Sequence, residues 1–102
     1  MSRISAATAA EVHQRADGHC EACTLPLGVD GGVFHHRKLR SRGGLDDAVN
    51  LMEVHMVCHT GHARSIHGCP ARSDRLGHMV SAGADPADVP VIVAVDLFAL
   101  RA

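Results

Sequence analysis

Two short pairs of metal-binding residues constrain this chain more than any other feature. Cys20 and Cys23 form a Cys-x-x-Cys turn, and His55 and Cys58 repeat that spacing further along the chain. Two ligands at this spacing can reach one tetrahedral ion, so the two pairs together predict a Cys3His site. Four protein ligands close the coordination sphere, which favours a structural zinc ion over a catalytic one. The alternative is a redox pair or buried thiols. A redox Cys-x-x-Cys usually joins a strand to a helix of a parallel sheet, and no such pattern surrounds Cys20.

The composition explains why such a chain needs an ion. Its 102 residues suffice for one domain, but they include two Phe and no Tyr or Trp. Small domains with so little aromatic surface commonly rely on a metal, a disulfide or oligomerisation. We find no apolar run of membrane-spanning length and no secretory leader, so we expect a cytoplasmic protein with reduced cysteines. Cys69 lies outside both pairs and is expected to be free.

Periodicity and turn residues predict a small α+β domain. Helices are expected over residues 5–16, 57–65 and 70–76, and strands over 33–37 and 50–55. Residues 40–44 read as a loop because two consecutive glycines end it. Residues 85–90 read as a turn, followed by an extended apolar segment over 91–95.

A second cluster consists of His35, His36, Asn50, His59 and His67. Adjacent residues of a strand point to opposite faces, so His35 and His36 imply two different roles. A neutral imidazole can bind a divalent ion or accept a proton near neutral pH. One histidine of the pair could therefore bind an ion while the other deprotonates water. The alternative is that both are packing or solvated histidines.

A basic segment follows this histidine pair. Arg37, Lys38, Arg40 and Arg42 fall within six residues, and no acidic residue lies between Asp30 and Asp46. The net charge of −1 excludes a globally basic surface, so nucleic acid would have to bind at this local patch. Such cations would contact backbone phosphates without reading sequence. A solvated loop is the alternative.

The order of these motifs resembles the HNH endonuclease family, and most closely its zinc-stapled members from bacteriophages and prophages. The resemblance spans residues 17–70 of a single domain over 1–102, with 71–102 as a C-terminal extension. It implies a ββα-metal core with a structural zinc knuckle and flanking short helices. The motifs that carry it are Cys20-x-x-Cys23, the run from His35 to Gly44, Asp47, Asn50-Leu51 and His55-x-x-Cys58-His59.

The resemblance also implies roles for individual residues. His35 and His59 fall on metal ligands, His36 on the general base, and Asn50 on the asparagine that orients the base or its loop. The usual third ligand, one turn after His59, is replaced by Ala63. His67 or His62 must then complete the metal site, and we favour His67.

The implied activity is hydrolysis of DNA, with double-stranded DNA as the expected substrate. The implied cofactors are a structural Zn²⁺ and a catalytic Mg²⁺, Mn²⁺, Ni²⁺ or Zn²⁺, of which Mg²⁺ suits an all-imidazole set least. Family members can accompany phage packaging (terminase) proteins, which are possible partners. The competing interpretation is a non-catalytic, zinc-stabilised nucleic-acid-binding module.

Overall fold

An antiparallel hairpin lies at the centre of the molecule. The computed structural model describes residues 4–93, in which β1 (Val33–His36) pairs with β2 (Leu51–Val54). Val33 lies opposite Val54 and His36 opposite Leu51. Both strands fall where the sequence predicts them, each slightly shorter than expected. A two-stranded hairpin is at best marginally stable alone, so other elements must cover its faces.

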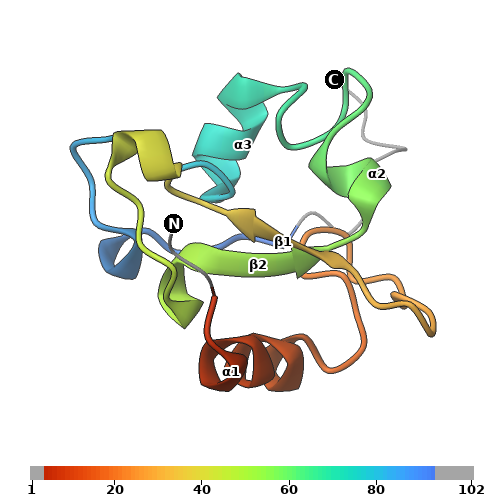
Figure 1. Ribbon diagram of the computed structural model, residues 1–102. Helices are drawn as coiled ribbons and strands as arrows, with labels where there is room; N and C mark the ends of the chain where they lie inside the picture. The colour runs from red at the N-terminus through yellow and green to blue at the C-terminus, as the bar shows by residue number, and fades with distance from the viewer. Residues whose placement is uncertain (1–3, 94–102) are drawn as a thin grey trace.

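Helix α1 (Ala6–Ala16) covers one face of the hairpin, as Figure 1 shows beneath β2. The predicted helix is confirmed, and Ser5 caps it by accepting a hydrogen bond from the backbone amide of Thr8 at 3.1 Å. Val12 is fully buried against Leu51 of β2. This contact anchors the helix, because most of its other residues are solvent-exposed.

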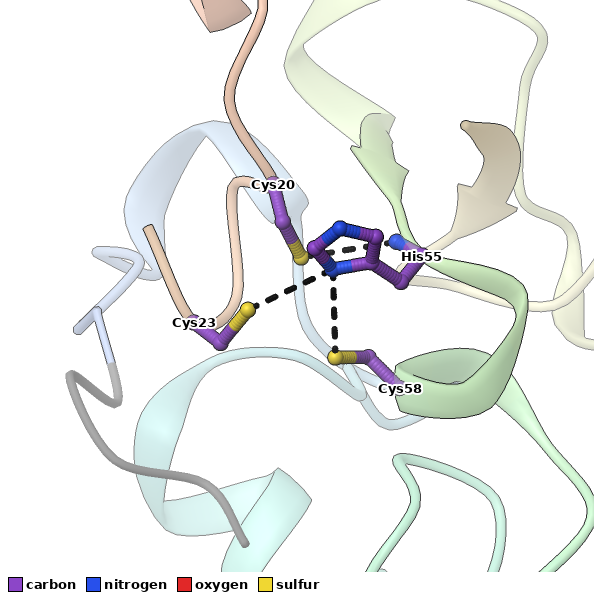
Figure 2. Close-up of side chains that lie close together, drawn as sticks. All are labelled: Cys20, Cys23, His55 and Cys58. Carbon is purple, nitrogen blue, oxygen red and sulfur yellow. Dashed lines mark hydrogen bonds between the residues drawn. The ribbon is translucent and has the colours of Figure 1, made fainter. Parts of the chain in front are cut away.

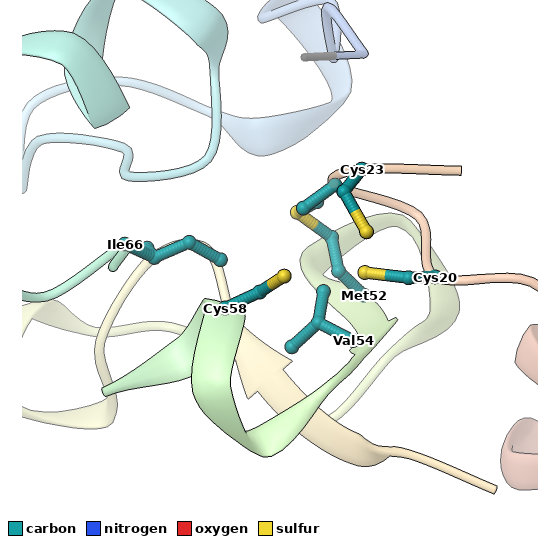
Figure 3. Packing of buried hydrophobic residues seen from close by; sticks show 7 residues of the cluster. Cys20, Cys23, Met52, Val54, Cys58 and Ile66 are labelled. Carbon is teal, nitrogen blue, oxygen red and sulfur yellow. The ribbon is translucent and has the colours of Figure 1, made fainter. Parts of the chain in front are cut away.

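The opposite face of the hairpin carries the larger apolar cluster. Met52 and Val54 of β2 point into it, as the alternation of side chains along a strand requires. Figure 3 shows cysteine thiols pointing toward the same interior. The buried members of the cluster are Cys20, Ala22, Cys23, Met52, Val54, Cys58 and Ile66. Three of these seven residues, the cysteines, are also candidate metal ligands.

Helix α2 (Met56–His59) is a single turn, so the helix predicted over residues 57–65 is too long. Thr60 is extended and Gly61 has a φ of 106°, a backbone conformation that favours glycine. The chain then folds back on α2. The amide of Ile66 donates to the carbonyl of Cys58 at 2.7 Å, and the amide of His67 to that of His59 at 3.1 Å.

Helix α3 (Pro70–Leu76) has the predicted bounds, with Pro70 in its first turn. Short 3-10 turns occupy Arg40–Arg42, Ala48–Asn50 and Pro86–Asp88, the last within the predicted turn. Residues 91–93 form no strand, and the rest of the extended segment predicted there lies outside the described residues. None of the helices in residues 4–93 is long and apolar enough to cross a membrane.

Residues 77–92, which we call the strap, are tied to the end of β1 by Arg37. Arg37 is only 2% exposed. The guanidinium donates to the carbonyls of Gly77, Val49 and Pro86 at 2.8, 2.8 and 3.2 Å, and also to that of Val89. Arg37 therefore does not belong to the predicted DNA-contacting patch, because its N–H groups are hydrogen-bonded to backbone carbonyls of the protein. The C-terminal extension, as far as it is described, is therefore fastened to the hairpin by hydrogen bonds.

We predict that Arg37→Met destabilises the protein by about 3 kcal/mol or more, because four buried or partly buried carbonyls lose a charged donor. Urea unfolding of the zinc-loaded protein measures the change. Arg75→Met is the matched control, since Arg75 is exposed on α3. Equal unfolding midpoints for the two variants would show that the strap does not depend on Arg37.

Candidate metal centres

Cys20, Cys23, His55 and Cys58 converge at one point, as their spacing predicts. One ligand atom from each residue lies within 4.8 Å of all the others. The sulfurs of Cys23 and Cys58 lie 3.4 and 3.9 Å from Nδ1 of His55 (Figure 2). All three cysteines are buried. A closed set of three sulfurs and one nitrogen is the donor set of a structural zinc site.

Backbone hydrogen bonds hold these ligands in place. The amide of Thr24 donates to the carbonyl of Cys20 at 2.8 Å and closes the Cys-x-x-Cys turn. Nε2 of His55 donates to the carbonyl of Pro26 at 2.8 Å, which leaves the Nδ1 lone pair facing the sulfurs. A second hydrogen bond of this kind fixes the tautomer of a ligating imidazole.

The electrostatics of this cluster also suit a cation. Burial is the main cause that raises the pKa of both Cys23 and Cys58. Without a cation the buried thiols keep their protons, and a bound metal must displace them. Zinc retention should therefore fall as the pH falls. Cys69 lies outside the cluster and is partly buried.

A second convergence brings together His35, His59 and His67. Their ligand atoms also lie within 4.8 Å of one another. The ring centroid of His35 lies 5.1 Å from that of His59 and 5.2 Å from that of His67. Nε2 of His59 lies 3.0 Å from Nε2 of His67. β1, α2 and the loop after α2 each supply one ring to this cluster.

The orientation of His35 is the clearest sign of a metal site. Its Nε2 donates to the carbonyl of His78 in the strap at 2.6 Å. Its Nδ1 is buried, and within residues 4–93 it has no hydrogen-bond partner. Burial lowers the pKa of His35 to about 3, and burial also lowers that of His59. A buried, neutral lone pair without a partner is costly unless a cation occupies the space it faces.

The three-histidine cluster differs from the cysteine cluster in its access to solvent. His35 is buried, His59 is half-buried and His67 is exposed. Three protein ligands with an exposed side leave coordination positions for water or substrate, which is the arrangement of catalytic sites. A possible second metal site therefore stands beside the closed one, linked to it by the neighbours Cys58 and His59.

The returning loop selects His67 over His62 as the third histidine. Nε2 of His62 donates to the carbonyl of Val57 at 2.7 Å, and its Nδ1 accepts from the amide of Arg64 at 3.1 Å. Gly68 permits the tight return, because a Cβ there would lie 2.0 Å from the carbonyl oxygen of His62.

His36 lies apart from the three-histidine cluster. It is paired with Leu51, on the strand face opposite to that of His35, which agrees with the expected divergence of the two rings. Its Nε2 donates to a carboxylate oxygen of Asp46 at 2.7 Å. The motif that carries the resemblance includes Asp47 and not Asp46, and only the folded loop brings Asp46 to His36.

Asn50 is buried and fastens the loop that follows β1. Its side-chain oxygen accepts from the amide of Lys38 at 2.7 Å. Its amide nitrogen donates to the carbonyls of Lys38 and Leu45 at 3.0 and 2.9 Å. Asn50 thus holds the two ends of the basic loop together, in line with the loop-orienting role that the resemblance implies.

Three cations of the predicted patch remain near the surface. Lys38 is half-buried and donates to the carbonyl of Ala84 at 2.9 Å. Arg40 is exposed and pairs with Asp46 at 3.0 Å. Arg42 is exposed, with one long hydrogen bond of 3.4 Å to the carbonyl of Val80.

No family model, curated protein or solved structure compared with this chain matches it.

We predict that Cys58→Ser abolishes zinc binding and unfolds the protein, whereas Cys69→Ser changes neither. Serine cannot replace the thiolate ligand, and structural zinc supplies much of the folding free energy of small domains. Metal analysis of the purified proteins and circular dichroism measure the two effects. Full zinc occupancy in the Cys58 variant would rule out the Cys3His assignment.

For the second cluster, we predict that His67→Ala weakens metal binding and His62→Ala does not. Losing an outer-shell partner alone typically costs about 10–100-fold in affinity, and losing a ligand should cost at least that much. Titration of the zinc-loaded protein with Co²⁺, followed by its visible absorption, measures the affinity. Equal losses in the two variants would contradict the ligand choice.

Proposed function

We propose that this chain is a metal-dependent endonuclease of the HNH type, which hydrolyses phosphodiester bonds of double-stranded DNA. Two observations on His35 carry the proposal: its buried Nδ1 has no hydrogen-bond partner among residues 4–93, and the residue offers a ligand atom within 4.8 Å of those of His59 and His67. The element order β1, β2, α2, a hairpin followed by a short helix, supports the proposal because the resemblance implies a core of this kind.

A divalent ion bound by the three histidines would stabilise the negative charge that develops on the phosphate during hydrolysis. His35 and His59 enter as neutral ligands because burial lowers their pKa. The exposed side at His67 leaves room for a DNA backbone to approach.

In this proposal His36 is the general base. It accepts a proton from water, whose oxygen then bonds to phosphorus while the bond from phosphorus to the 3′ oxygen breaks. The leaving oxygen takes a proton from solvent. His36 ends β1 directly after His35, so a phosphate bound at this end of the strand would lie near both residues. Asn50 supports the reaction by holding the adjoining loop.

The surface cations Arg40 and Arg42, with Lys38 beside them, would contact the DNA backbone. Such contacts carry no base information, so we expect low sequence specificity. Because they act through phosphate charge, binding should weaken as the salt concentration rises.

We predict that His36→Ala lowers the rate of plasmid nicking by about 10²–10⁴-fold, the usual contribution of a positioned base. Nicking of supercoiled plasmid would be followed with Mg²⁺, Mn²⁺, Ni²⁺ or Zn²⁺ added to the zinc-loaded protein. His19→Ala is the control, since His19 is exposed and outside both clusters. If the His36 variant nicks plasmid at the wild-type rate, His36 is not the general base. Salt-sensitive DNA binding without nicking in any metal would instead identify a non-catalytic binding module.

A further inference from the structure

A carboxylate holds the ring of His36 from the loop that follows β1. Nε2 of His36 lies 2.7 Å from Oδ1 of Asp46, and the two side chains are only 17% and 13% exposed. Arg40 reaches the same carboxylate oxygen with its Nε and with a terminal nitrogen, each at 3.0 Å. Asp46 is thus shared between a cation near the surface and a partly buried imidazole.

This pairing decides which nitrogen of His36 carries the proton. Asp46 also accepts from the guanidinium of Arg40, and a carboxylate that accepts from two neighbours offers them oxygen lone pairs, not a proton. Nε2 of His36 must therefore be the N–H, and the lone pair of the neutral ring lies on Nδ1. Within residues 4–93, no protein group is hydrogen-bonded to that Nδ1.

The loop geometry makes the contact specific to Asp46. The neighbouring Asp47 is exposed, and its side chain makes no capping hydrogen bond to the short helical turn that it precedes. The backbone carbonyl of Asp47 accepts from the amide of Asn50 at 3.0 Å. Asn50 also holds the loop at Lys38 and Leu45, and Leu45 is adjacent to Asp46. The hydrogen bonds of Asn50 thereby bring Asp46 to His36.

We propose that Asp46 is a positioning residue that orients His36 and holds it as the Nε2–H tautomer, with Nδ1 as the proton-accepting atom. The catalytic part of this inference rests on the function proposed above. The tautomer is a property of the protein alone. A carboxylate partner commonly fixes the ring orientation and tautomer of a functional imidazole. Arg40 would thus have a second task beside DNA contact, because it holds the Asp46 carboxylate in place.

The tautomer is tested by nuclear magnetic resonance on the zinc-loaded full chain labelled with ¹⁵N-histidine, at a pH where the ring is neutral. The shifts of the two ring nitrogens distinguish a protonated from an unprotonated nitrogen, and His36→Gln assigns the signals. We expect a single Nε2–H form in the wild type and in Asp47→Asn. In Asp46→Asn the shifts should move toward a mixture of the two tautomers. An Nδ1–H form in the wild type, or unchanged shifts in Asp46→Asn, would overturn the inference.

The catalytic role is tested by nicking kinetics on the same variants, after circular dichroism has established that each folds. We expect Asp46→Asn to lower kcat by about 10–100-fold with little change in KM, the usual cost of losing a supporting partner. Asp47→Asn should cut like the wild type. Equal kcat values for the two variants would show that Asp46 does not support catalysis. If the wild-type protein shows the Nε2–H form but never cuts DNA, the proposed nuclease function fails while the tautomer assignment stands.

Discussion

The convergence of three buried cysteines and one histidine is the constraint on which the rest of the structure depends. It ties the turn that follows α1 to the end of β2 and the start of α2. The same cysteines make up much of the larger apolar cluster, in a chain with only two Phe and no Tyr or Trp. Binding of structural zinc is typically worth about 10–16 kcal/mol, while small domains are stable by about 5–15 kcal/mol. An ion in this cluster would therefore decide whether the chain folds.

The cysteine cluster also determines where the three-histidine cluster forms. Cys58 and His59 are consecutive in α2, and the loop after α2 returns through hydrogen bonds to the carbonyls of both residues. His67 reaches His59 only because of that return. The two candidate metal sites therefore share one helical turn, and displacement of Cys58 would separate the histidines.

Much of this arrangement follows from the sequence, because side-chain chemistry and spacing are local properties. The cap at Ser5 and the proline at residue 70 predict α1 and α3 correctly, and the His-x-x-Cys pair predicts the ligands at the end of β2. What could not be predicted depends on distant backbone atoms. From the sequence, Arg37 is one cation of a basic patch. In the structure, carbonyls of the strap accept hydrogen bonds from its guanidinium. Asp46 and Asp47 are neighbouring residues of the same type, and only the folded loop shows that Asp46 contacts His36.

The strap has a consequence for transplanting the motif. The carbonyl of His78 orients the ring of His35, and Arg37 anchors the segment that carries this carbonyl. All the ligands precede residue 70, but the backbone group that turns one of them toward the other two follows it. A graft of the minimal motif onto a foreign scaffold would carry the zinc knuckle intact. The rings of its three histidines would not be aligned unless the host scaffold supplied a carbonyl that accepts a hydrogen bond from Nε2 of His35.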